Sequence, residues 1–226
     1  MNILALDTSD QVLSVALATG SGLWYSEIDS FPRHSELLME CVDTICNIAG
    51  LGRQDLERLA CMKGPGSFTG LRIGFSAAKG LAMALGIPLL SLPTLDCLAY
   101  SLSIWPGMVI PVIDAKKDCF FAAIYRGGKR LTDYLDLSVE DLAKEAAKLT
   151  MAEKEQIVIT GSGAELLFPR LTAFIPQEQI RLDPGFRKGR ARELLEMAKS
   201  IILEKSNDID SGPLYIRKSD AELNKA

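Results

Sequence analysis

Residues 64–74 read GPGSFTGLRIG and follow a short apolar stretch. Glycine adopts backbone conformations that other residues avoid, so this segment predicts a tight turn between a strand and a helix. Backbone N–H groups at such a helix start attract anions. The segment is not a P-loop, because Gly70 is followed by Leu71 and Arg72 rather than by Lys and Ser or Thr. It is suited either to an anion cradle with Arg72 nearby or to a turn that only packs closely, and we favour packing.

A row of small residues runs from this turn into the helix that is expected to follow it. Every fourth position is glycine or alanine, at Gly66, Gly70, Gly74, Ala78 and Ala82. On a helix, this spacing makes a shallow groove that another helix can approach closely. The partner can be the chain's own sheet or helix, or another subunit. We regard this small-residue row as a candidate helix-to-helix protein interface.

Strand and helix patterns on both sides of the segment predict an α/β fold. Three short strand patterns, a helical period over 35–49 and a fourth strand precede it, and a helix to about Leu85, a fifth strand and another helix to about residue 103 follow it. A second hairpin pattern then opens with MVIPVID (108–114). After it come a helix over 138–149 with Ser138 as its N-cap, a strand, a short helix and an amphipathic helix over 190–204.

Each half opens with a hairpin whose first strand ends in aspartate, Asp7 in the first half and Asp114 in the second. This repetition indicates an internal duplication, with two half-sheets facing one another across a cleft, as in actin-like nucleotide-binding proteins. We place an N-terminal lobe at 1–103 and a smaller C-terminal lobe at 104–226, divided at Trp105-Pro106-Gly107. The last helix and the tail are expected to pack back on the first lobe.

Composition limits the chemistry that is open to this chain of 226 residues. Its formal charge of −4, from 25 Lys and Arg against 29 Asp and Glu, argues against a surface that mainly binds nucleic acid. The single histidine, His34, excludes a multi-histidine metal centre, which leaves a metal-dependent peptidase with little support. We expect His34 to be a solvated or capping residue at a helix start. A basic run over 187–192 is more often a solvated face than a site for RNA or an acidic partner.

The cysteines and the apolar stretches indicate where the protein is found. Five cysteines without a C-x-x-C pair, mostly in apolar surroundings, are typical of reduced thiols in a cytosolic protein. The first residues show no basic lead and no cleavage site, so we expect no signal peptide. The stretch Leu71–Leu92 is broken by charges, glycines and a proline, whereas a membrane span needs about 20 apolar residues in a row. We therefore expect a cytoplasmic protein without a membrane segment.

Polar residues at the strand ends are candidates for nucleotide or phosphate binding. Asp7 with Thr8, and Asp114 in the second half, are suited to hold a Mg²⁺–phosphate group. Gly161 and Gly163, between a strand and a helix, are suited to shape an adenosine pocket, although G-x-G alone is a weak signal. No glycine follows Asp114 directly, which weakens a second phosphate loop. An ATP-dependent phosphotransferase or ATPase is therefore kept as the alternative function.

Four segments occur here in one order: ILALDTS (3–9), RHSE (33–36), GPGSFTGLRIG (64–74) and PLYIR (213–217). Together they resemble the TsaB (YeaZ) family, over the whole chain and more strongly in its first hundred residues. The resemblance implies the actin/Hsp70/sugar-kinase (ASKHA) fold, with two duplicated lobes and mixed sheets. It also implies a non-catalytic subunit that binds and activates TsaD, together with the ATPase TsaE, in the bacterial synthesis of threonylcarbamoyladenosine in tRNA.

The resemblance also bears on metal, nucleotide and partner binding. Catalytic TsaD carries a His-x-x-x-His metal motif where this chain reads LPTLDCL (92–98), so we expect no metal and no intrinsic cofactor. ATP or ADP would bind only at the partner interface. Helices of the N-terminal lobe form the family's contact with TsaD, which makes Glu36, Met39 and the small-residue row the candidates here. Alone, the chain is expected to form a homodimer, and it would meet tRNA only through the complex.

Overall fold

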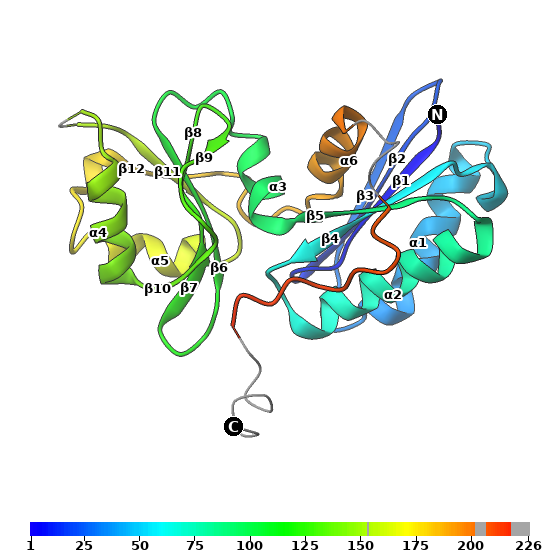
Figure 1. Ribbon diagram of the computed structural model, residues 1–226, viewed down its shortest axis with the longest axis horizontal. Helices are drawn as coiled ribbons and strands as arrows, with labels where there is room; N and C mark the ends of the chain where they lie inside the picture. The colour runs from blue at the N-terminus through cyan, green and yellow to red at the C-terminus, as the bar shows by residue number, and fades with distance from the viewer. Residues whose placement is uncertain (153, 202–206, 218–226) are drawn as a thin grey trace. The chain divides into compact units, whose positions relative to one another are not determined.

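The computed structural model describes residues 1–152, 154–201 and 207–217 (Figure 1). The chain divides into two compact units. Unit 1 holds Met1–Cys97 and Lys188–Leu214, and unit 2 holds Leu98–Arg187 and Tyr215–Ala226. We expected a single boundary near residue 103. Instead the chain leaves unit 1 after Cys97, returns to it at Lys188 and leaves it again after Leu214.

Unit 1 is built on a mixed sheet with the strand order β3-β2-β1-β4-β5. Its strands are β1 (Ile3–Asp7), β2 (Val12–Ala18), β3 (Leu23–Asp29), β4 (Arg58–Gly64) and β5 (Leu89–Pro93). The first three strands pair antiparallel, whereas β4 runs parallel to β1 and to β5. Side chains alternate along the strands, so one face of the sheet carries mainly leucines and the other mainly alanines and other residues.

Helices cover both faces of this sheet (Figure 1). The leucine-rich face packs against α1 (His34–Ile48) and α2 (Phe68–Leu85). The alanine-rich face packs against α6 (Ala191–Ser200), since small side chains let this helix approach closely. A short 3₁₀ helix, η1 (Arg53–Asp55), leads into β4, and α3 (Thr94–Tyr100) follows β5. The helix expected over 190–204 is confirmed as far as Ser200, and residues 202–206 lie outside the described part.

Unit 2 repeats the plan with the strand order β10-β7-β6-β11-β12. Its strands are β6 (Met108–Asp114), β7 (Cys119–Ala122), β10 (Leu135–Ser138), β11 (Ile157–Thr160) and β12 (Ile180–Leu182), with an added hairpin of β8 (Tyr125–Arg126) and β9 (Lys129–Arg130). Its helices are α4 (Val139–Leu149), α5 (Ala164–Leu171) and the 3₁₀ helix η2 (Gln177–Gln179). The stretch 119–126 forms two short strands, β7 and β8, rather than one continuous strand.

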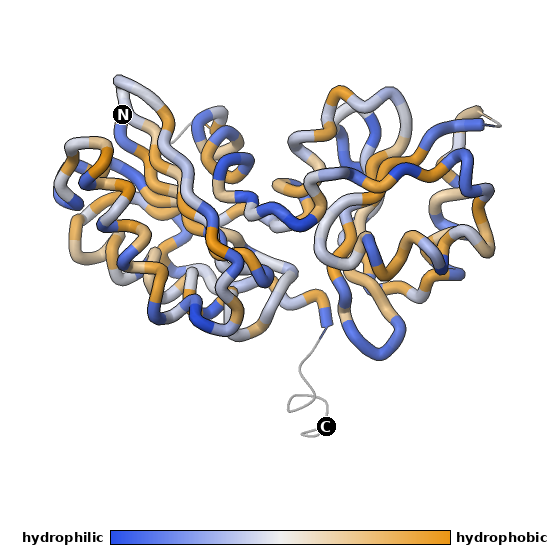
Figure 2. Tube along the Cα trace, turned by 180° about the vertical axis from the view of Figure 1, so that it is seen from behind, coloured by the Kyte–Doolittle hydropathy of each residue, from blue (hydrophilic) through white to orange (hydrophobic). Residues whose placement is uncertain are grey.

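The two sheets have the same topology. In each sheet, three strands pair antiparallel: β1, β2 and β3 in unit 1, and β6, β7 and β10 in unit 2. The first of these, β1 or β6, also pairs with a parallel strand, β4 or β11, which in turn pairs with another parallel strand, β5 or β12. Apolar residues concentrate on the strands, while the helices alternate between apolar and polar residues (Figure 2). The molecule therefore has the duplicated α/β fold of the actin/Hsp70/sugar-kinase class that the sequence predicts. None of the described helices combines the length and the apolar character that crossing a membrane requires.

Candidate functional site

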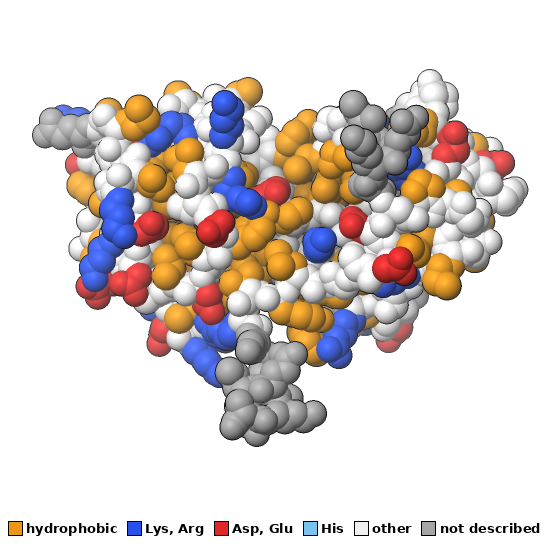
Figure 3. All heavy atoms as spheres, viewed as in Figure 1, with side chains coloured by type: hydrophobic (Ala, Val, Ile, Leu, Met, Phe, Trp, Pro, Cys, Tyr) orange, Lys and Arg blue, Asp and Glu red, His pale blue; other side chains and the backbone are white. Residues whose placement is uncertain are grey.

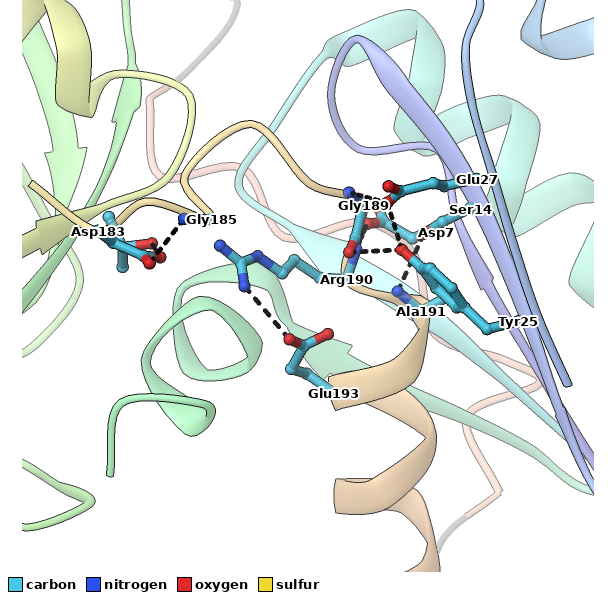
Figure 4. Close-up of polar contacts among 11 residues, drawn as sticks. Asp7, Ser14, Tyr25, Glu27, Asp183, Gly185, Gly189, Arg190, Ala191 and Glu193 are labelled. Atoms are coloured by element: carbon cyan, nitrogen blue, oxygen red, sulfur yellow. Dashed lines mark hydrogen bonds and ion pairs between the residues drawn. The ribbon is translucent and has the colours of Figure 1, made fainter. Parts of the chain in front are cut away.

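Asp7 ends β1 and is only 2% exposed. Its Oδ1 accepts hydrogen bonds from the backbone N–H of Ser9 at 2.9 Å and from the Ser9 hydroxyl at 2.6 Å. Its Oδ2 accepts the backbone N–H of Arg190 at 2.8 Å (Figure 4). Burial raises the pKa of this carboxyl above its usual value, and the hydrogen bonds from Ser9 and Arg190 act in the opposite direction. Both carboxylate oxygens are thus engaged by the chain itself.

The start of α6 is capped by residues of the sheet. The N–H of Arg190 bonds to Asp7, and the N–H of Ala191 bonds to the hydroxyl oxygen of Ser14 at 3.0 Å. The first N–H groups of a helix have no partner within the helix, so both bonds satisfy donors that would otherwise be buried and unpaired. A Cβ on Gly189 would overlap the side chain of Ser14, which explains why glycine precedes this helix start.

Two residues of β3, on the same face of the sheet, also hold this segment (Figure 4). The hydroxyl of Tyr25 lies 2.9 Å from the Gly189 carbonyl oxygen and 2.6 Å from the Glu27 carboxylate. The backbone N–H of Gly189 donates to that carboxylate at 3.2 Å. Burial and the neighbouring Glu27 carboxylate raise the pKa of Tyr25. Three neighbouring strands therefore fix the backbone at the start of α6.

The small-residue row lets α2 cross directly over the end of β1. A Cβ on Gly66 would lie 2.5 Å from the Ser9 carbonyl oxygen, and a Cβ on Gly70 or Gly74 would overlap Thr8. The Thr8 hydroxyl donates to the Gly70 carbonyl at 2.7 Å. Thr8 and Ser9, directly after β1, thus occupy the space that larger residues at positions 66, 70 and 74 would need.

Gly70 and Gly74 are buried, Gly66 is half-buried, and Ala78 and Ala82 are 0% and 1% exposed. Of the two alternatives that the spacing left open, the structure shows the row packed inside the chain's own unit 1, so these small residues do not themselves face a partner. Glu36 is exposed and Met39 is half-buried on α1. Their contact with a partner stays a prediction, and any contact through α2 has to use the exposed residues of that helix.

Asp114 holds the position in unit 2 that Asp7 holds in unit 1. Its Oδ1 accepts the N–H of Lys116 at 2.8 Å, the same local bond that Asp7 makes with Ser9. Its Oδ2 pairs with the Lys116 ammonium at 2.6 Å. Partial burial acts to raise the pKa of Asp114, but the hydrogen bonds and charge of Lys116 outweigh it and leave this pKa below its usual value. The negative charge of Asp114 is thus balanced by the ammonium group of Lys116, two residues further along the same loop.

Gly161 and Gly163 allow the start of α5 to approach β6. Gly161 has a φ of 92°, and a Cβ there would overlap the Val112 carbonyl oxygen. A Cβ on Gly163 would lie 2.9 Å from the backbone nitrogen of Asp114. Close packing inside unit 2 accounts for both glycines, and their predicted contact with a nucleotide stays a prediction.

The family model of "TsaD: tRNA N6-adenosine threonylcarbamoyltransferase" matches residues 29–224 of this chain. The chain belongs to the TsaD family. It is 35% identical over 127 residues to the tRNA threonylcarbamoyladenosine biosynthesis protein TsaB of Bacillus subtilis, covering 56% of each chain. It is 35% identical over 129 residues to the TsaB of Escherichia coli, covering 56% of this chain and 55% of that one. The matches span about half the length of these curated relatives.

A solved structure identifies the branch of the TsaD family. YeaZ from Pseudomonas aeruginosa superposes with a TM-score of 0.77 at 25% identity, over 95% of this chain and 99% of that one. The TsaB relatives and this YeaZ structure together identify the chain as a TsaB (YeaZ) homologue. Its similarity extends to transferases, since it is 32% identical over 150 residues to the tRNA N6-adenosine threonylcarbamoyltransferase of Cereibacter sphaeroides, covering 61% of this chain and 41% of that one.

Several residues of this TsaB homologue differ from our expectations. We expected a solvated or capping histidine at position 34. His34 is only 2% exposed, its Nε2 lies 3.0 Å from the Gln11 carbonyl oxygen, and α1 has no side-chain cap bond, so this expectation is wrong. In the basic run, Arg187, Lys188 and Arg192 are exposed, as expected of a solvated face, and Arg190 is buried. His34 contacts the Gln11 carbonyl and Arg190 contacts Asp7, and contacts with such separate segments are not visible in the local sequence.

Sequence reasoning missed Ser14, Tyr25, Glu27 and Gly189 in the Asp7 network. Ser14 is an inward-facing polar residue in an otherwise apolar strand, and this was the one local signal of a buried hydrogen bond. The others gave none, because their partners lie more than 160 positions away along the chain.

Proposed function

We propose that this chain is the non-catalytic subunit that binds and activates a TsaD-type transferase, together with the ATPase TsaE, in the formation of threonylcarbamoyladenosine in tRNA. Two kinds of relative support the proposal: TsaB proteins, which are named for this biosynthesis, and the transferases of the same family. In this proposal the chain meets tRNA only within the complex.

The hydrogen bonds of the Asp7 carboxylate to the chain itself are the observation that supports a non-catalytic role. A carboxylate that binds a Mg²⁺–phosphate group has to offer its oxygen atoms to the metal or to its water shell. Here Ser9 and Arg190 already donate three hydrogen bonds to those oxygens, and the carboxylate is buried. The strand end therefore serves to hold α6, and the alternative function as a phosphotransferase gains no support from it.

The second aspartate supports the same interpretation. The charge that a bound metal would supply at Asp114 is supplied by the Lys116 ammonium, 2.6 Å away. We propose that this chain has no intrinsic cofactor, and that ATP or ADP binds only where the chain meets its partner.

The partner surface that we propose consists of α1 and the exposed residues of α2. Apolar side chains are exposed at the ends of both helices: Phe31 (59%), Ile48 (69%), Phe68 (46%) and Met83 (73%). In Figure 3, apolar side chains reach the surface where Figure 1 draws α2. Exposed apolar groups among charged residues are typical of protein interfaces. Glu36 and Met39 lie on the same α1, and the same surface would join two copies in a homodimer when the partner is absent.

Reconstitution of the modification tests the proposal. The transferase of the same organism, TsaE, the threonylcarbamoyl donor and unmodified tRNA are combined with and without this chain, and modified adenosine is measured. We expect modification only, or far more rapidly, when the chain is present. Equal modification without it contradicts the proposal, and turnover of Mg²⁺–ATP by the isolated chain that Asp7→Ala abolishes would establish the alternative.

A further inference from the structure

The described end of the chain returns to unit 1 and covers the free edge of β5. The backbone N–H of Asp208 donates to the Leu89 carbonyl at 2.8 Å. The backbone N–H and the hydroxyl of Ser91 donate to the Asp208 carboxylate at 2.7 and 2.8 Å. The last strand of a sheet leaves such groups unpaired, so residues 207–208 act as a short cover for this edge. Figure 1 draws this C-terminal segment, residues 207–214, in orange and red beside the sheet.

The same segment then reaches the turn between β4 and α2. The N–H of Leu214 donates to the Lys63 carbonyl at 2.6 Å. The next residue, Gly64, has a φ of 108°, and a Cβ there would lie 2.7 Å from the Leu214 carbonyl oxygen. The first glycine of GPGSFTG is therefore required both by its backbone conformation and by the close approach of the C-terminal segment.

The other side of the turn is held by the end of β1. The N–H of Ser67 donates to the Ser9 carbonyl at 2.7 Å. Ser67 is also the N-cap of α2, because its hydroxyl oxygen accepts the N–H of Gly70 at 3.2 Å. The turn over residues 64–67 thus lies between Ser9 on one side and Leu214 on the other. Ile209 extends this contact, since it packs against the core that α1 and α2 share.

We propose that the C-terminal segment is a positioning element that fixes the turn over 64–67 and, through it, the start of α2. The inference rests on the proposed function, because Phe68 and Arg72 in the first turns of α2 belong to the proposed partner surface. The Arg72 guanidinium lies 3.8 Å from the centroid of the Phe68 ring, so a shift of the helix start moves both groups together. In this proposal the segment affects partner affinity through the turn.

Two matched pairs of variants in the full-length chain test this role. Leu214→Pro removes the N–H that bonds to Lys63, whereas Leu214→Ala keeps it. Asp208→Ala removes the carboxylate that Ser91 bonds to, whereas Asp210→Ala alters an exposed carboxylate two residues further on. Amide hydrogen exchange of residues 64–72 and the dissociation constant for the TsaD-type transferase of the same organism are measured for each variant.

We expect Leu214→Pro and Asp208→Ala each to accelerate exchange over 64–72 by about fivefold to tenfold, as the loss of one or two hydrogen bonds predicts, and to weaken binding by a similar factor. The two controls should match the unaltered chain, and exchange in β1 and β2 of unit 1 should stay unchanged in all variants, which shows that unit 1 remains folded. Unchanged exchange over 64–72 in both test variants overturns the inference, and so does faster exchange with unchanged affinity. If the unaltered chain does not bind the transferase, the proposed function fails, while the exchange rates still decide whether the segment fixes the turn.

Discussion

The side-chain carboxylate of Asp7 accepts the backbone N–H of Arg190, a residue 183 positions later in the chain, at 2.8 Å. The bond joins the end of the first strand to the start of α6. An aspartate at the end of the first strand of such a fold is a candidate ligand for metal and phosphate, and in this structure its carboxylate caps the start of α6. The consequences can be measured on stability as well as on activity.

The first prediction concerns the pH dependence of stability. Burial raises the pKa of Asp7 above the value of about 3.9 that an unfolded aspartate has. Between these two pKa values the folded chain binds more protons than the unfolded chain, so the contribution of Asp7 to the free energy of unfolding falls as the pH rises. Asp7→Asn removes this titration. The free energy of unfolding of both chains is measured by urea unfolding at a series of pH values. We expect the value for Asp7→Asn to rise, relative to that of the unaltered chain, from about pH 4 up to the pKa of Asp7 in the folded state.

Asp43→Asn provides the opposite control. The hydrogen bond from Arg53 holds the pKa of Asp43 below its usual value, so its contribution is present above the unfolded pKa and is lost as the pH falls. The relative stability of Asp43→Asn should therefore decrease, or stay level, as the pH rises. A stability difference for Asp7→Asn that is the same at every pH would contradict the assignment of a raised pKa to Asp7.

The second prediction concerns the cap of α6. Ser14→Ala leaves the buried N–H of Ala191 without its acceptor, so we expect a loss of about 1–2 kcal/mol in the free energy of unfolding. Ser76→Ala, at an exposed position of α2, is the matched control and should change stability by less than about 0.5 kcal/mol. Equal effects of the two substitutions would mean that Ser14 does not cap the helix.

The third prediction compares two glycines on α2. A Cβ on Gly74 would overlap the Thr8 hydroxyl, so Gly74→Ala should destabilise the chain by about 1–3 kcal/mol. Nothing lies within 4 Å of a Cβ built on Gly80, so Gly80→Ala should stabilise the chain by about 0.5–1 kcal/mol, because alanine favours the helix. Thermal or urea unfolding measures both, and a stable Gly74→Ala variant would contradict the close contact between α2 and β1.

The fourth prediction concerns the partner surface. Met83 on α2 is 73% exposed, and Met83→Glu should weaken binding to the TsaD-type transferase by about tenfold if α2 contributes to the interface. Ile104 in unit 2 is 93% exposed, and Ile104→Glu should leave binding unchanged. Titration calorimetry compares the two variants. Similar affinities for both would place the interface away from α2.

The small-residue row shows where sequence reasoning stopped. Its spacing of four residues predicts correctly that some element lies very close to α2. The spacing does not say whether that element belongs to the same chain. The answer depends on the end of β1, because Thr8 and Ser9 occupy the space beside the row.

The sequence by itself determined the elements whose signals are local. Alternating and helical periods predicted the β1–β2 hairpin, α1 and α4, and Ser138 was expected as a cap and accepts the N–H of Asp141. Two hairpins whose first strands end in aspartate, at Asp7 and Asp114, predicted that the fold is duplicated. These signals are readable because residues a few positions apart along a strand or helix share a face or a hydrogen bond.

Only the tertiary structure decided what Asp7, Gly64 and Gly189 do. Each of them is explained by a residue far along the chain: the N–H of Arg190, the carbonyl of Leu214 and the side chain of Ser14. A hydrogen bond or a close approach between distant segments leaves no periodic trace in the sequence, because it depends on how the sheet brings those segments together. The sequence therefore identified Asp7 and the glycine-rich turn at Gly64 as unusual positions. It did not show that they contact the start of α6 and the C-terminal segment of the same chain.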